Sequence, residues 1–140
     1  MVEPWQLTPV VELDVVLRLI IAALIGGLIG YERERAEKPA GFRTHLLVCV
    51  GAALLTIISV YGFGASSDPS RVAAGIVVGI GFLGAGTILR GEREVIGLTT
   101  AATVWVVAAI GMALGLGLYL VAAVTAVIAF IALRFPVLHH

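Results

Sequence analysis

The chain has 140 residues, of which 60% are hydrophobic and 13% charged, and its nine Lys and Arg balance its nine Asp and Glu. A mean hydropathy of +1.09 excludes an ordinary soluble domain and indicates a polytopic membrane protein. The charges lie in segments of mixed sign, which argues against nucleic acid as a partner and leaves the lipid bilayer as the main one.

A helix that crosses the hydrocarbon core needs roughly 20 apolar residues, so this length predicts an all-α bundle of five transmembrane helices. In chain order we expect them at about residues 13–31, 44–61, 69–89, 98–114 and 118–133. Thr8 and Pro9 fit the start of the first helix, and Asp68 with Pro69 fits the start of the third. We therefore expect a single transmembrane domain over residues 1–140, with no soluble C-terminal domain.

The basic residues are distributed unequally between the two sides of the predicted bundle. Outside the spans, one side carries only Arg71. The other side carries Arg33, Arg35, Lys38, Arg43, Arg90, Arg93 and Arg134. Short loops rich in Lys and Arg stay in the cytoplasm, so we expect the N-terminus outside and the C-terminus inside.

Asp14 and Arg18 are the ionisable residues within the first predicted span. They are one turn apart on one helix face, in the order that favours a helical ion pair. One interpretation is a purely structural pair. The other is that Asp14 faces a water-filled vestibule and binds a cation such as Mg²⁺, which takes oxygen ligands from one or two carboxylates. As the only carboxylate well inside a span, Asp14 would need other copies of the chain or backbone carbonyls to complete such a site.

The polar residues near the ends of the spans form no catalytic constellation. Glu32 and Glu34 are alternative cation ligands, although Arg33 and Arg35 compete for them, and the segment also fits a solvated extension of the first helix. Threonines 99, 100 and 103 are spaced to hydrogen-bond a neighbouring helix. The sequence offers no Ser/His/Asp set, no Cys/His set and no metal cluster, so we expect neither an enzyme nor a bound cofactor.

Glycines recur at a spacing that permits close helix contact in a membrane. The candidate packing positions are Gly26, Gly30, Gly75, Gly79, Gly81, Gly84 and Gly86, with a further pair at Gly111 and Gly115. Small residues let backbones approach within one bundle or between two copies of a chain. The string GIGFLGAG also contains a dinucleotide-binding pattern, but it lies inside a predicted span; a locally unwound third helix is the functional alternative.

Four segments together resemble one known family. They are GGLIGYERE, AGFRTHLLVCVGAALLT, DPSRVAAGIVVGIGFLGAGTIL and GLTTAATVWVVAAIGMALG, which occur in the order and with the loop lengths of the MgtC/SapB family of bacterial inner-membrane proteins. The family motifs map onto Asp14, Gly30, Glu32, Arg33, Gly41, Arg43, Thr44, Arg71, Gly81, Gly84, Gly86, Gly97, Thr99 and Thr100. We add Arg18 and His45 to these as candidate functional polar residues.

The resemblance implies five membrane helices, a role in growth under low Mg²⁺ and, in pathogens, virulence through survival inside macrophages. It also implies restraint of a partner membrane complex such as the F-type ATP synthase, which is the function we expect. Separately from the resemblance, we expect homo-oligomers such as a dimer. Two alternatives remain. One is a transporter or channel for Mg²⁺ or another cation, with Asp14 on the path, and the other is a structural membrane scaffold. Family members often carry a soluble C-terminal domain, so we expect this chain to be a short form or a truncated one.

Overall fold

The computed structural model describes residues 7–90 and 94–135 of the chain. Its helices are α1 (Pro9–Arg35), α2 (Phe42–Tyr61), α3 (Ser70–Ala85), α4 (Leu98–Gly115) and α5 (Tyr119–Arg134). A short antiparallel hairpin of β1 (Leu89–Arg90) and β2 (Val95–Ile96) joins α3 to α4. The prediction of an all-α chain with five helices is confirmed, whereas the hairpin was not predicted.

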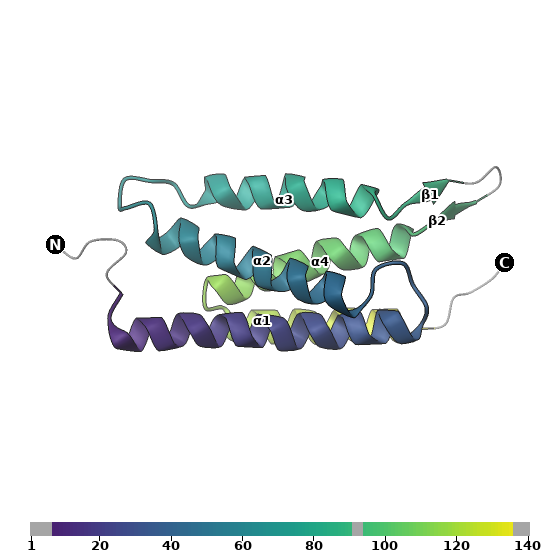
Figure 1. Cartoon of the computed structure of the whole chain (residues 1–140), viewed down its shortest axis with the longest axis horizontal. Coiled ribbons are helices and arrows are strands. Elements are labelled where there is room, and N and C mark those ends of the chain that lie inside the picture. The colour runs from purple at the N-terminus through teal and green to yellow at the C-terminus, as the bar shows by residue number, and fades with distance from the viewer. Residues whose placement is uncertain (1–6, 91–93, 136–140) are drawn as a thin grey trace.

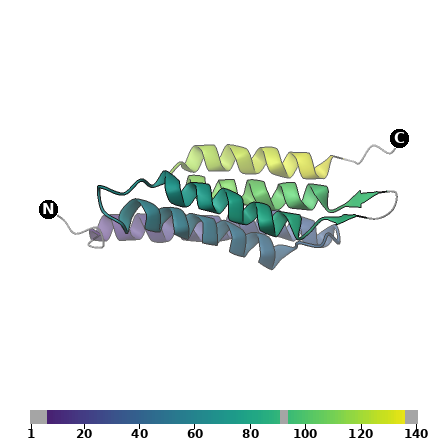
Figure 2. The ribbon, with the colours of Figure 1, turned by 90° about the horizontal axis from the view of Figure 1, so that it is seen from above.

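The helices run along one axis and alternate in direction, as the colour progression shows for α1 to α4 in Figure 1 and for α5 in Figure 2. The central pair is α2 and α4. α1 packs most extensively on α2, while α3 and α5 both pack chiefly on α4. Figure 2 shows α5 on one side of the bundle and α1 with α2 towards the other. The start of α1 and the end of α5 therefore lie at opposite ends of the bundle.

Local side-chain chemistry explains where two of the helices begin. The hydroxyl of Thr8 accepts a hydrogen bond from the Val11 N–H at 3.3 Å, which caps α1 as predicted. Asp68 accepts hydrogen bonds from the Ser70 N–H and hydroxyl at 3.0 and 2.7 Å, at the start of α3. These two bonds stabilise the carboxylate and lower the pKa of Asp68.

The third helix ends earlier than predicted. We expected it to reach residue 89, but α3 ends at Ala85 and the chain turns at Gly86 into β1. Gly97 then adopts a φ of 93° at the entry to α4, a left-handed conformation that glycine accepts without strain. The end of α3 could not be predicted from hydropathy, because the apolar run continues through Ile88 and the residues that end α3 are as apolar as those that lead into β1.

Four glycines bring backbones into direct contact at the centre of the bundle. A Cβ on Gly26 would lie 2.7 Å from the Cys49 Cβ, and one on Gly30 would lie 2.8 Å from the Gly41 carbonyl oxygen. On the other side of α2, a Cβ on Gly115 would lie 2.7 Å from the Ala53 carbonyl oxygen. A Cβ on Gly111 would overlap the Cys49 carbonyl oxygen. The predicted packing by these glycines occurs within one chain.

The glycines of α3 behave differently. A Cβ on Gly75, Gly79 or Gly81 would meet nothing within 4 Å, whereas one on Gly84 would lie 3.4 Å from the Ala101 carbonyl oxygen of α4. Gly75, Gly79 and Gly81 therefore make no close helix contact among the described residues, and packing by these three between copies of the chain stays a prediction. The helix is also continuous from Ser70 to Ala85, so the unwound alternative is wrong.

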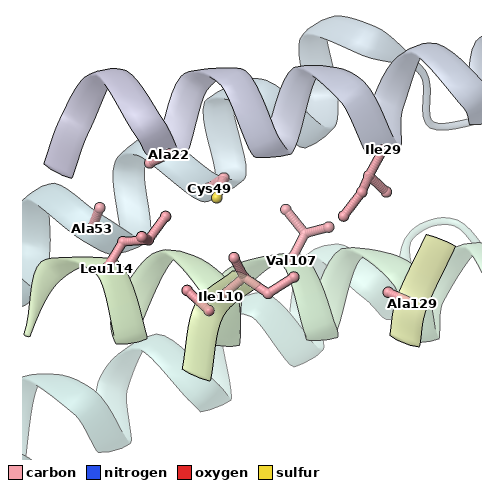
Figure 3. Packing of buried hydrophobic residues seen from close by; sticks show 9 residues of the cluster. Ala22, Ile29, Cys49, Ala53, Val107, Ile110, Leu114 and Ala129 are labelled. Atoms are coloured by element: carbon pink, nitrogen blue, oxygen red, sulfur yellow. The ribbon is translucent and has the colours of Figure 1, made fainter. Parts of the chain in front are cut away.

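The interior between the helices is apolar. Its central cluster draws Ala22, Ile29, Cys49, Ala53, Val107, Ile110, Leu114, Ala122 and Ala129 from α1, α2, α4 and α5 (Figure 3). The side chains are mostly small or β-branched, which allows the short interhelical distances that the glycines set. Cys49 packs here as a small apolar residue, because its side chain is fully buried in this cluster.

Three of the helices are long and apolar enough to cross a membrane, namely α1, α2 and α4. α3 and α5 are apolar but have 16 residues each, which corresponds to about 24 Å at 1.5 Å per residue. The exposed surface is rich in large hydrophobic side chains such as Leu120, Val78 and Phe82. The chain is a multi-pass membrane protein.

The contrast between the two sets of glycines predicts opposite effects of one substitution. Gly111→Ala should destabilise the protein by about 1–3 kcal/mol, because the new methyl group meets the backbone of α2. Gly75→Ala should be neutral or stabilising by up to about 1 kcal/mol, because the space is open and alanine favours a helix. Denaturant unfolding of the purified protein in detergent measures both; equal destabilisation would contradict the assignment.

Candidate functional site

Polar side chains gather at the two ends of the bundle. The first group, which we call the Asp14 cluster, consists of Asp14, Arg18, Tyr119 and the carbonyl of Gly115. Arg18 Nε donates to Asp14 Oδ2 at 2.8 Å, and the Tyr119 hydroxyl donates to Asp14 Oδ1 at 2.6 Å. Arg18 Nη1 also donates to the Gly115 carbonyl oxygen at 2.8 Å. The cluster thus ties α1 to the end of α4 and the start of α5.

The predicted Asp14–Arg18 pair is therefore present, and its geometry bears on the cation hypothesis. Both carboxylate oxygens of Asp14 already accept hydrogen bonds from side chains of the same chain. The Arg18 side chain is only 12% exposed, and its guanidinium places a fixed positive charge on that carboxylate. Coordination of a cation by Asp14 would compete with these partners and with the charge of Arg18, so the arrangement favours the structural interpretation.

The second group, the Arg33 cluster, consists of Arg33, His45 and Thr100 at the opposite end of the bundle. Arg33 is 4% exposed, and its Nη2 donates to the Thr100 hydroxyl at 3.3 Å across the interface between α1 and α4. His45 is fully buried, with Nδ1 2.8 Å from the Gly41 carbonyl oxygen. Arg33 Nε and His45 Nε2 are buried and have no hydrogen-bond partner among residues 7–90 and 94–135.

These contacts correct the interpretation of the charged segment after the first span. We expected a solvated face, but Arg33 points into the bundle while Glu34 and Arg35 remain exposed. A helix turns about 100° per residue, so one residue of a charged run can face the core while its neighbours face water. Of the predicted threonine contacts, Thr100 reaches a neighbouring helix, whereas the Thr103 hydroxyl donates to Thr99 of its own helix.

The other candidate residues do not join either cluster. Those that are exposed on the surface are Arg43, Thr44, Arg71 and Thr99. Glu32 is half-buried next to Arg33, and its Oε2 is buried without a hydrogen-bond partner among the described residues. Arg93 lies outside the described residues. Among residues 7–90 and 94–135, no group of three or more His, Cys, Asp or Glu could hold a metal ion.

Sequence reasoning missed Tyr119 as a member of the Asp14 cluster. Tyr119 is 105 positions from Asp14, and no periodic pattern links residues that far apart. The short link between α4 and α5 was the available signal. It fixes the start of α5 beside the end of α4, where Arg18 also reaches the Gly115 carbonyl.

The Arg33 cluster predicts different effects of one substitution at two neighbouring threonines. Thr100→Val removes the acceptor of a buried guanidinium and should destabilise the protein by about 1–3 kcal/mol. Thr99→Val is the matched control, because Thr99 is exposed and the change in shape is the same. Unfolding in detergent measures both; a cost at Thr100 no larger than at Thr99 would exclude a stabilising role for the contact.

The Asp14 cluster yields a similar test. Tyr119→Phe removes only the hydroxyl that Asp14 binds and should lower the midpoint of thermal unfolding by several degrees. Tyr31→Phe, at an exposed tyrosine, should leave the midpoint unchanged. If the two variants unfold at the same temperature, the Tyr119 hydroxyl does not hold α5 to α1.

Comparison with known proteins places the chain in a family. The sequence pattern of the MgtC family matches residues 19–139. Protein MgtC of Brucella abortus is 54% identical over 106 residues, which cover 76% of this chain and 44% of that protein. The Escherichia coli K12 protein named "Putative magnesium transporter YhiD" is 50% identical over 113 residues, covering 76% of this chain and 53% of the relative.

A third relative, protein SapB of Bacillus subtilis, is 42% identical over 123 residues, covering 82% of this chain and 51% of SapB. The chain thus spans about half the length of the curated relatives that it matches. No solved structure matches it. Since the matched pattern begins within α1 and extends over every later helix, this chain belongs to the MgtC family.

Proposed function

We propose that this chain is a regulator in the bacterial inner membrane that supports growth in low magnesium by binding and restraining a partner membrane complex, such as the F-type ATP synthase. It carries out no catalytic reaction. The relatives named MgtC support the link to this family's role, and the apolar interior of the bundle supports a regulator over a conduit.

The interior between the Asp14 cluster and the Arg33 cluster carries this proposal. Cys49, Val107, Ile110 and Leu114 fill it, and each is at most 1% exposed. Mg²⁺ demands octahedral oxygen ligands and gives up its water reluctantly. A path through one chain would have to replace this packed layer with oxygen ligands. Such a bundle is better suited to bind another protein at its surface than to pass an ion through its centre.

The groove between α2 and α3 is the membrane face on which we place the partner. It has a volume of about 540 Å³ and a lining of apolar residues that includes Gly51, Gly75 and Gly79. None of these glycines has an atom of another residue near the position of a Cβ. A helix of the partner complex can therefore approach the backbone of α3 as closely as α4 approaches α2 within the bundle.

Five crossings and a cytoplasmic basic end are part of the proposal. The helices alternate in direction, and the end that holds the Arg33 cluster also holds Arg35, Lys38, Arg43 and Arg134. Short basic segments of this kind favour the cytoplasm. The two helices of about 24 Å are shorter than the hydrocarbon core, and local thinning of the bilayer accommodates such a mismatch at modest cost.

Two substitutions on α3 test the partner surface. Gly79→Ile fills the groove and should abolish co-purification of ATP synthase subunits from bacterial membranes, together with inhibition of ATP-driven proton pumping in inverted vesicles. Gly81→Ile is the matched control, because Gly81 is equally open but does not line the groove. If the Gly79→Ile variant still binds the ATP synthase subunits, the groove is not the partner surface. If this variant loses only crosslinked homodimers, the occupant of the groove is a second copy of the chain.

Mg²⁺ transport is the second candidate function, because the name of the Escherichia coli K12 relative describes it as a putative magnesium transporter. Asp14 is the residue that this candidate requires, as the carboxylate inside a span. In liposomes that contain an Mg²⁺-sensitive dye, we expect no flux from the purified chain. If the unmodified chain carries an Mg²⁺ flux and the Asp14→Asn variant does not, the regulator proposal is overturned in favour of Mg²⁺ transport.

A further inference from the structure

The side of the bundle between α1 and α5 contains two hollows that join. The first is an apolar groove of about 350 Å³, lined by residues such as Ile25, Val127 and Ile131. The second is a pocket of about 360 Å³ at the basic end, which contains Tyr31, Glu32, Arg35 and Arg134. Leu28 and Phe130 line both, so the pocket continues directly into the groove.

This side is open because α1 and α5 barely touch. Both helices pack on α4, and direct contacts between them are few. In Figure 2, α5 lies apart from α1 along most of its length. A long, thin apolar molecule can therefore enter from the side, as a lipid does when it leaves the bilayer plane for a groove between helices.

Two arginines supply positive charge in the pocket. The guanidinium of Arg35 lies 5.9 Å from the centre of the Tyr31 ring, and that of Arg134 lies 5.7 Å from the centre of the Phe130 ring. Cation–π contacts of this kind hold the side chains without neutralising them. Within the described residues the one ion pair is Asp14–Arg18, so neither arginine has a carboxylate within 4 Å. Both can bind an anionic oxygen.

The third charged group in the pocket is Glu32. Its Oε2 is buried and has no hydrogen-bond partner in the part of the chain that the structure describes, which is costly unless a ligand or water donates to it. Two guanidinium groups and one carboxylate leave a net charge of one positive unit. The complementary ligand therefore carries a single negative charge, a hydroxyl donor and an apolar chain.

We infer that this combined site binds an anionic glycerophospholipid whose headgroup carries hydroxyl groups, as phosphatidylglycerol does. The phosphodiester accepts from Arg35 and Arg134, a headgroup hydroxyl donates to Glu32, and one acyl chain lies in the groove lined by Ile25 and Val127. Phosphatidylethanolamine also has donors, but its ammonium leaves the pocket charge unbalanced. The inference does not depend on which end of the bundle faces the cytoplasm.

Native mass spectrometry of the full chain in detergent tests the inference with defined dioleoyl lipids. We expect phosphatidylglycerol to bind at least tenfold more tightly than phosphatidylethanolamine or phosphatidylcholine. The double variant Arg35→Gln/Arg134→Gln should lose at least tenfold in affinity for phosphatidylglycerol. The matched control is Arg43→Gln/Arg71→Gln, which removes the same charge from two exposed arginines outside the pocket and should bind as the unmodified chain does.

Two further arms separate the parts of the site. Phosphatidylmethanol has the same single charge without a hydroxyl, so it should bind several-fold more weakly, and Glu32→Ala should abolish that difference. Val127→Trp should block the groove and weaken binding without touching the arginines. Circular dichroism and gel filtration confirm that each variant is folded.

Three results would overturn the inference. One is equal binding of all the lipids, and another is full binding by the Arg35/Arg134 double variant. The third is thermal stabilisation of the protein by inorganic phosphate alone to the same extent as by phosphatidylglycerol, which would identify a site for a free anion instead of a lipid.

Discussion

The direct contact of helix backbones on the two sides of α2 is the constraint on which the rest of the structure depends. Gly26 and Gly30 bring α1 onto one side, and Gly111 and Gly115 bring α4 onto another. In lipid there is no hydrophobic force between helices, so close van der Waals contact has to supply the association. The short distances also leave room only for small or slender side chains between the helices. The apolar interior around Cys49 is a consequence of that spacing.

Local features of this fold could be predicted from the sequence, and features that join distant segments could not. The Thr8 cap and the Asp14–Arg18 pair were predictable because each joins residues within one turn of a helix. The contact of Arg33 with Thr100 joins residues 67 positions apart, and it depends on the rotation of α1 about its own axis. A charged run fixes that rotation poorly, since hydrophobic neighbours are what decide which face of a helix is buried.

The glycines also show that a local sequence pattern does not determine which helices come into contact. The spacing of Gly75 and Gly79 is identical to that of Gly26 and Gly30, yet one pair is open and the other is packed. The glycine spacing indicates only that another helix can approach this backbone closely. The connections between the helices decide whether another helix of the chain packs there. α3 is held by its contact with α4 and by the bond from the Ser59 hydroxyl to the Pro69 carbonyl oxygen, so its glycine face stays free.

The distribution of polarity separates the surfaces that can recognise something from the part that only holds the fold. Among the described residues, buried polar atoms without a hydrogen-bond partner lie at the basic end, on Glu32, Arg33 and His45, while both carboxylate oxygens of Asp14 at the other end accept hydrogen bonds. An unsatisfied buried group costs stability, so a fold that retains three of them at one end gains there if a ligand, a water or a partner chain supplies the missing partners. The two ends are therefore chemically unequal. The Asp14 end fastens the helices together, and the Arg33 end is the one whose chemistry is left open to other molecules.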